Sequence, residues 1–201
     1  MSLTVDSNST STIAPIPEGT YLAVCNMLID LGVQFNKAYK NSSKKVLIGW
    51  EIPEETFTNS DGKELPKTLS KRYTASLNDK SNLRKDLAAW RGRDFTEEEL
   101  KAFDLRNIIG KSCLINVIHR DSGDKTYPQV ASIMALPKGM KPGKLSTDPL
   151  IFDLDKDELN LIEFLPEWIQ KIIKNSTTYQ EKTLVPPEVN ELPADDEEAP
   201  F

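Results

Sequence analysis

Few residues in this chain of 201 suit metal or redox chemistry. It has two cysteines and one histidine. Cys25 and Cys113 lie far apart in apolar, strand-like surroundings, so we expect reduced core residues rather than a disulfide framework. With His119 they are the only soft metal ligands, and none has a second ligand at zinc spacing. We therefore predict no metal site and no cofactor.

Long apolar runs are missing too. Hydrophobic residues make up 38% of the chain and charged residues 28%, which is enough apolar material for a core. No stretch approaches the ~18 consecutive apolar residues that a membrane span requires. The first residues, MSLTVD, have neither the basic start nor the apolar block of a secretory signal. We therefore expect no membrane contact and a cytoplasmic location.

Catalytic patterns are also absent. No motif gives the single histidine a serine or cysteine partner, and the carboxylates are scattered through helical and loop contexts. Asp153, Asp155 and Asp157 imitate the start of a calcium-binding loop. The turn position holds Glu158 instead of glycine, however, and the twelfth position holds Phe164. We therefore interpret these acids as a solvated run and predict that the protein is not an enzyme.

The charge that is present is distributed unevenly. Residues 1–145 carry 21 Lys+Arg against 17 Asp+Glu, a net of +4, whereas residues 146–201 carry 4 against 14, a net of -10. A mildly basic body joined to a strongly acidic end is expected when one part faces a polyanion and the other does not.

Strand patterns divide the chain into regions. Residues 1–17 are rich in Ser, Thr, Asn and Pro without periodicity, so we expect a disordered arm. β-forming or alternating segments then follow at residues 20–31, 44–52, 68–77, 112–120 and 127–136, the last two joined by a short polar loop with a glycine. We therefore predict that residues 18–145 form one mainly β domain.

A helical insertion separates the third and fourth strands. Ser81 can cap a helix in which Leu83, Leu87 and Trp90 recur at helical spacing. A second, shorter helix is indicated after it by a capping box of Thr96 with Glu99. Five strands with a helix between the third and fourth is the element order of an OB-fold, a five-stranded Greek-key barrel that often binds oligonucleotides.

The C-terminal part is divided into an extension and a tail. In the extension, residues 146–175, the segment 161–174 has a helical apolar pattern with Pro166 near its first turn. We expect this helix to pack on the barrel or on another subunit. Residues 176–201 hold four prolines, seven acids and one lysine, so we expect a disordered acidic tail.

Single-strand binding requires cations for phosphates and aromatic faces on which bases stack. The DNA-binding candidates, most of them strand-borne or in turns, are Trp50, Lys71, Arg72, Tyr73, Arg91, Arg93, His119, Arg120, Lys125 and Tyr127. Trp50 and Tyr73 share faces with aliphatic residues, so each is about as suited to the core as to a stacking platform. We predict that at least one of the two stacks on a base.

The last seven residues form the most specific motif. They are Asp195, Asp196, Glu197, Glu198, Ala199, Pro200 and Phe201. This ending resembles the acidic tip of bacterial and bacteriophage single-stranded DNA-binding proteins, and the helical insertion favours a phage origin. The resemblance implies that the four acids, Pro200 and Phe201 bind replication, recombination or repair proteins such as a polymerase, helicase or primase, in the cytoplasm of a bacterial host.

These observations predict a protein that binds and coats single-stranded DNA, without catalysis, and recruits partners through its tip. A homo-oligomer, with a dimer favoured, is compatible with the sequence. The alternative is a protein-interaction adaptor that binds no DNA, in which the barrel only supports the tail. Titration with oligo(dT) separates the two.

Overall fold

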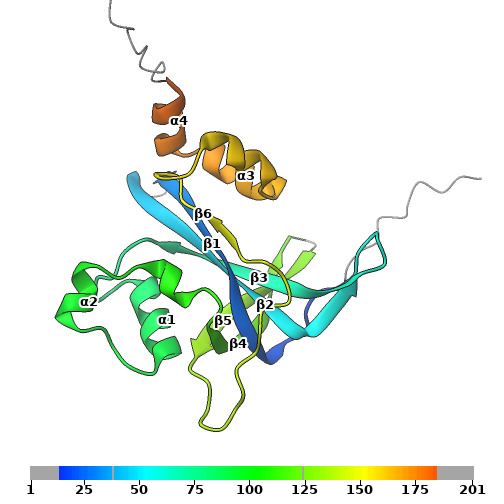
Figure 1. Cartoon of the computed structure of the whole chain (residues 1–201). Helices are drawn as coiled ribbons and strands as arrows, with labels where there is room; N and C mark the ends of the chain where they lie inside the picture. Colours follow the sequence, from blue (N-terminus) through cyan, green and yellow to red (C-terminus); the bar gives the residue numbers. More distant parts are fainter. Residues whose placement is uncertain (1–13, 38, 124, 185–201) are drawn as a thin grey trace, which may run out of the picture.

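The computed structural model describes residues 14–37, 39–123 and 125–184. Its centre is a mainly antiparallel sheet (Figure 1), and the five expected strands are confirmed. The first, second and fourth are longer than predicted, and the third and fifth begin and end earlier. They are β1 (Gly19–Asn36), β2 (Asn41–Thr58), β3 (Glu64–Thr74), β4 (Ser112–Ser122) and β5 (Lys125–Met134). The chain is therefore mainly β, as predicted.

The long first strand organises the sheet. Strand order is β3-β2-β1-β4-β5, because β1 pairs with β4 over Gly19 to Val24 and with β2 over Val24 to Asn36. Irregular pairing between Cys25 and Met27 bends β1 where it changes partners. β3 and β5 are the two edges and share no hydrogen-bonded ladder, so the closed barrel predicted from the element order is not formed.

Helix α1 (Asn82–Arg91) packs against both β3 and β5. Its Leu83, Leu87 and Trp90 are buried in the main core, as their spacing predicts. The Ala135 N–H donates to the Ala89 carbonyl at 3.0 Å, which anchors the end of the helix beside the end of β5. α1 thus fills the space between the two edges that the sheet leaves open.

The predicted caps of the helical insertion are confirmed. Ser81 accepts a hydrogen bond from the Arg84 N–H, and α2 (Glu97–Lys101) begins with the capping box of Thr96 and Glu99. A short 3-10 turn, η1 (Leu105–Ile108), then leads into β4. Local side-chain to backbone hydrogen bonds fix these starts, which is why the sequence alone reveals them.

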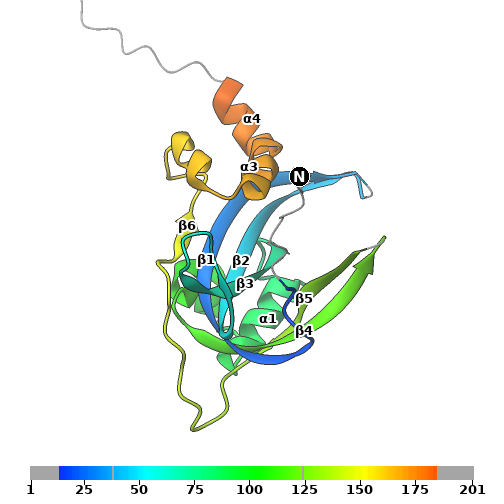
Figure 2. The same cartoon turned by 90° about the vertical axis from the view of Figure 1, so that its right-hand side faces the viewer.

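The C-terminal extension joins the sheet instead of standing apart. Strand β6 (Leu150–Phe152), which the sequence did not predict, pairs in parallel with β1. The 3-10 turn η2 (Leu159–Phe164) and α3 (Glu167–Lys174) follow, and they form a second apolar cluster with Ile29, Leu31 and Leu47 of β1 and β2. Figure 2 shows this layer above the curved first hairpin.

Two expectations for this part were wrong. Residues 161–174 do not form one helix, because Pro166 lacks an N–H and disfavours helical backbone at the residue before it. Pro166 instead precedes α3 as its N-cap. The predicted disorder also starts too early, since residues 177–184 form α4 (Thr177–Leu184). The buried Ser176 accepts from the Tyr179 N–H and so starts that helix. Residues 185–201 lie outside the described residues.

Both cysteines are free and buried, as predicted. Burial raises the pKa of Cys25 to about 12. The N-terminal arm is ordered earlier than expected, because Ile16 is buried in the main core. Tyr21 donates its hydroxyl to the Pro17 carbonyl at 3.0 Å and helps to hold this segment. Residues 1–13 lie outside the described residues.

Candidate nucleic-acid interface

Trp50 and Tyr73 are core residues. Trp50 is fully buried on β2, and Tyr73 on β3 is nearly so. The Tyr73 hydroxyl donates to the Asp86 carboxylate of α1 at 2.8 Å. Burial and this carboxylate raise the Tyr73 pKa. The prediction that one of them stacks on a base is wrong for this structure, because neither ring presents a face to solvent.

Arg91 and Arg93 stabilise the helical insertion. Both guanidinium groups pair with the Glu99 carboxylate. Arg91 also lies over the Phe95 ring, 4.3 Å from its centroid, and is mostly buried. The hydrogen bonds from Arg93 and from the Thr96 N–H lower the Glu99 pKa to about 2. Arg91 is therefore not available to a phosphate, and Arg93 already has a carboxylate partner.

His119 holds the N-terminal segment. Its Nε2 lies 2.8 Å from the Ile16 carbonyl, and its backbone N–H donates to Glu18 Oε1 at 2.7 Å. Both contacts place residues 16–18 across the end of β4. These contacts give His119 a structural role, whereas its role in nucleic-acid binding stays a prediction.

Arg120 and Tyr127 are cross-strand neighbours near the tip of the β4–β5 hairpin. Both side chains are exposed, and Arg120 has no carboxylate partner within the described residues. A cation beside an exposed ring is the pairing that a stacked nucleotide needs. The Lys125 side chain lies outside the described residues, so its role stays a prediction.

The remaining candidates, Lys71 and Arg72, line a surface hollow with two lysines that the sequence did not single out. We call it the basic hollow; its cations are Lys45, Lys71, Arg72 and Lys80, and Tyr73, Thr74, Ser81 and Asn82 complete the lining. No carboxylate belongs to this lining. Lys71 pairs with Asp86 at 2.8 Å, but the other three cations have no carboxylate partner within the described residues.

Strand pairing and helix position bring the basic hollow together. Lys45 pairs in register with Thr74 and donates to its hydroxyl at 2.7 Å, while Arg72 lies opposite Leu47 on the same ladder. Lys80 directly precedes the N-cap of α1. That helix has no acid in its first turn, so its positive end adds to the potential of the hollow. Lys45 is far from the other three cations in sequence, and the β2–β3 pairing brings it to them.

The tip of the β1–β2 hairpin carries a second group of exposed residues. The Phe35 and Tyr39 side chains are 59% and 79% exposed. Lys37 and Lys40 beside them are exposed as well. Lys45 is four residues further along β2 from Asn41, or about 13 Å at strand spacing. The alternation of aromatic and basic residues in 35–40 is the sequence signal that could have identified this tip.

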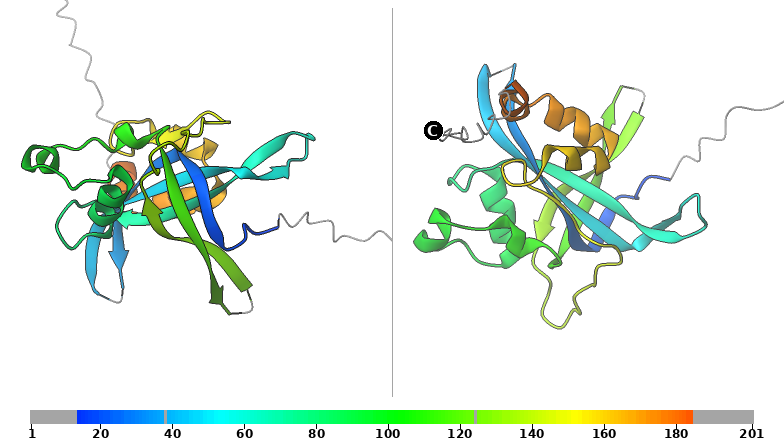
Figure 3. Two further views of the ribbon diagram at one scale, coloured as in Figure 1. Left: turned by 90° about the horizontal axis from the view of Figure 1, so that it is seen from below. Right: turned by 45° about the horizontal axis from the view of Figure 1, so that its top comes forward.

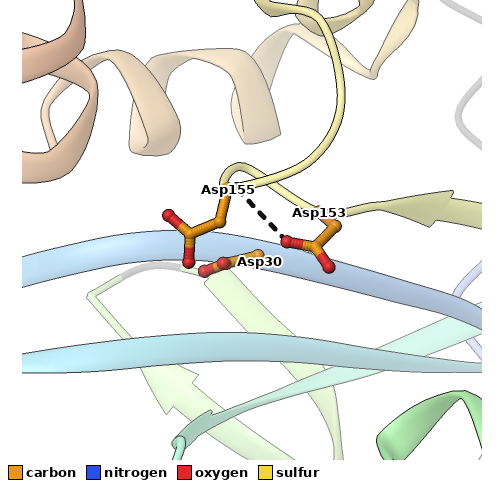
Figure 4. A group of neighbouring side chains, drawn as sticks. All are labelled: Asp30, Asp153 and Asp155. Atoms are coloured by element: carbon orange, nitrogen blue, oxygen red, sulfur yellow. Dashed lines mark hydrogen bonds between the residues drawn. The ribbon is translucent and has the colours of Figure 1, made fainter.

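The acidic run near residues 153–155 forms ion pairs that connect the extension to the sheet, instead of a solvated surface. Carboxylates of Asp30, Asp153 and Asp155 gather between β1 and the extension (Figure 4). Lys44 lies 2.9 Å from Asp30 and 2.6 Å from Asp155, and Arg106 lies 3.1 Å from Asp153. The hydrogen bond from Lys44 lowers the Asp155 pKa. Because protein cations neutralise these acids, the group ties β6 to the first hairpin and does not suit a metal ion.

Comparisons with known proteins assign no family to this arrangement. No protein-family model matches the chain, and no curated protein does. Within residues 14–37, 39–123 and 125–184, none of the helices has the length and apolar character to cross a membrane. The functional argument therefore depends on the geometry of the chain itself.

Proposed function

We propose that this protein binds and coats single-stranded DNA through the basic hollow and the neighbouring hairpin tip. The observation that carries the proposal is the hollow's composition, in which Lys45, Arg72 and Lys80 meet without a lining carboxylate. Three such cations on one small surface repel each other unless an anion compensates them. A polyphosphate strand supplies that compensation at regular spacing.

The strand connectivity supports an OB-type domain. β1 is shared between β2 and β4, and α1 connects β3 to β4 while packing against β3 and β5. We infer from this order an OB-type fold in which a helix, instead of a ladder, covers the β3–β5 seam. OB-folds bind oligonucleotides on the face of strands 2 and 3 and on neighbouring loops. Lys45 of β2 and Lys71 and Arg72 of β3 in the basic hollow support this proposal.

Exposed aromatic rings would supply the remaining binding energy. Each stacked base contributes about 1–3 kcal/mol and does so for every base type. Tyr39 on the first hairpin is the most exposed ring near the basic hollow. Tyr127 with Arg120 on the β4–β5 hairpin offers a second platform. Stacking requires unpaired bases, so duplex DNA gains only the phosphate contacts.

The acidic tip would recruit partner proteins. Asp195, Asp196, Glu197 and Glu198 meet basic residues of a polymerase, helicase or primase, and Phe201 inserts as the apolar group. Pro200 limits the conformations of this ending. A coating protein with such a tip marks single strands for replication, recombination or repair without any chemical step of its own.

Equilibrium titrations test the proposal. Labelled oligo(dT) and a duplex with the same number of phosphates are titrated with the protein at several salt concentrations, with fluorescence anisotropy as the readout. We expect much tighter binding of the single strand, with an affinity that falls at a log-log slope of about -0.7 per phosphate contact. Equal affinity for both DNAs contradicts the proposal, and binding to neither favours the adaptor function.

A further inference from the structure

An apolar patch is exposed on the C-terminal extension. It consists of Leu161, Phe164 and Trp168, which come from η2 and the first turn of α3. Phe164 is 82% exposed and Trp168 is 47% exposed, although the buried residues beside them, Ile162 and Ile169, pack into the second cluster. We call this the η2–α3 patch. Two large aromatic side chains held in solvent on ordered backbone indicate a contact surface.

The charges around the patch argue against a nucleic-acid ligand. Glu158 and Glu163 are exposed beside it, and neither has an ion pair within the described residues. Glu167 is paired with Lys171 at 2.6 Å. Unpaired carboxylates repel phosphates, so the aromatic rings here cannot serve as base platforms in the way that Tyr39 can. The patch instead suits a protein surface that combines apolar and basic groups.

A surface of that kind lies at the other end of the same molecule. Residues 137–144 form a loop after β5 with three exposed lysines, the exposed Met140 and no acid. Lys138, Lys141 and Lys144 have no carboxylate partner within the described residues. Figures 1 and 2 both show this loop at the bottom of the molecule and α3 at the top. We call it the basic loop.

We propose that the η2–α3 patch of one copy docks on the basic loop of the next copy, so that neighbouring molecules on a DNA strand contact each other head to tail. This inference rests on the proposed DNA binding. The flexible Met140 side chain adapts to an aromatic surface, and lysines pair with Glu158 and Glu163 or lie over the Trp168 ring. Because the two surfaces differ, each copy in such a contact has its other surface free for a further copy, so the contact can continue along a strand.

The small size of the patch explains why the contact between copies would form only when they are bound to the same DNA strand. The three side chains together expose on the order of 300 Å², well below the roughly 800 Å² per partner of a stable complex. The contact is therefore weak between free molecules. Two copies on one strand have a high effective local concentration, however, so a weak contact becomes cooperative binding.

Binding to one-site and two-site strands tests the proposal. The one-site strand is the shortest oligo(dT) that binds with full affinity, and the two-site strand is twice as long. We expect the wild-type protein to bind the second site at least about tenfold more tightly than the first. Phe164→Asp should bring this ratio close to one and leave the one-site affinity unchanged, because an 82% exposed side chain contributes little to folding. Leu184→Asp, at an equally exposed position on α4 outside the patch, should keep the wild-type ratio.

Charge reversal gives a second test with an internal rescue. Glu158→Lys with Glu163→Lys, or Lys138→Glu with Lys141→Glu, should each abolish the cooperative ratio. All four substitutions in one chain should restore it, because every copy then carries both complementary surfaces. Restoration excludes a loss of folding as the cause of the loss of cooperativity in either double variant.

The outcomes separate this inference from the proposed function. An unchanged ratio in Phe164→Asp overturns the head-to-tail contact and leaves another protein as the occupant of the patch. A matching loss of one-site affinity overturns it as well, because the patch then belongs to the DNA interface. If the wild-type protein binds no oligo(dT), the proposed function fails, and the head-to-tail contact is then tested by sedimentation at high protein concentration. Weak self-association that Phe164→Asp abolishes supports the contact. No self-association of the wild-type protein contradicts it.

Discussion

The rings of Trp50 and Trp90 lie 5.9 Å apart, tilted by 55°, and connect β2 to α1 inside the core. We therefore predict that Trp50→Ala lowers the free energy of unfolding by about 3–5 kcal/mol, because a large cavity remains. The DNA affinity of the folded fraction should stay the same. Denaturant unfolding followed by anisotropy titration measures both quantities.

Tyr39→Ala is the matched control for that substitution and should have the opposite effects. Its ring is 79% exposed, so stability should hardly change, while binding weakens by about 1–3 kcal/mol if it stacks on a base. If Trp50→Ala instead weakens DNA binding selectively and leaves stability intact, the buried placement of the tryptophan is incorrect.

The helical insertion should lose stability in acid. Arg93 and the Thr96 N–H hold the Glu99 pKa at about 2, below its ordinary value of 4.5. A lowered carboxyl pKa stabilises the fold above 4.5, and this contribution is lost as the pH falls from 4.5 toward 2. Glu99→Gln should therefore lower the melting temperature at neutral pH and reduce its decline below pH 4.5. The effect is modest, because the pair is solvent-accessible.

Thermal melts from pH 2 to 7 check this expectation. Glu98→Gln, a neighbouring exposed acid on α2 without an ion pair in the described part of the chain, is the control and should follow the wild-type curve. Identical slopes for Glu99→Gln and the wild type below pH 4.5 are incompatible with the role assigned to Glu99.

Partner recruitment by the acidic tail and DNA binding by the folded domain should be separable by truncation. Removal of Phe201 alone should abolish recruitment of polymerase or helicase partners and leave DNA affinity nearly unchanged. Deletion of residues 191–201 should raise DNA affinity modestly, most visibly at low salt, because the acids then no longer compete for cationic sites. Pull-downs and titrations with both truncated proteins measure this. A truncated protein that loses DNA binding, or keeps every partner, contradicts the division.

Local patterns predicted the elements that depend on local forces. Alternating residues gave the five strands, and the capping residues Ser81 and Thr96 marked the two helix starts. β6 and α4 were missed because their partners are distant. A three-residue strand has too little pattern of its own, and α4 depends on tertiary contacts such as the hydrogen bond from Lys182 to the Leu154 carbonyl, 2.6 Å long.

The functional surface was harder to predict than the fold. Trp50 shares its β2 face with Val46, Ile48 and Ile52, which all lie in the main core, but the same alternation also fits a strand that presents a stacking platform. Lys45 and Lys80 were not selected because nothing in the sequence joins positions that are 35 residues apart. The β2–β3 register and the start of α1 bring them together, as the two views in Figure 3 help to follow.

The salt dependence of a triple variant of the basic hollow tests the central claim most directly. Lys45, Arg72 and Lys80 are replaced by alanine together, and Lys63, Lys101 and Lys111, which are exposed elsewhere, are replaced in a control of equal charge. We predict that the hollow variant loses affinity for oligo(dT) and that its log-log salt slope becomes shallower by about 2, as three lost phosphate contacts require. The control should change far less. Equal losses in both variants would mean that general charge, and not the basic hollow, binds the strand.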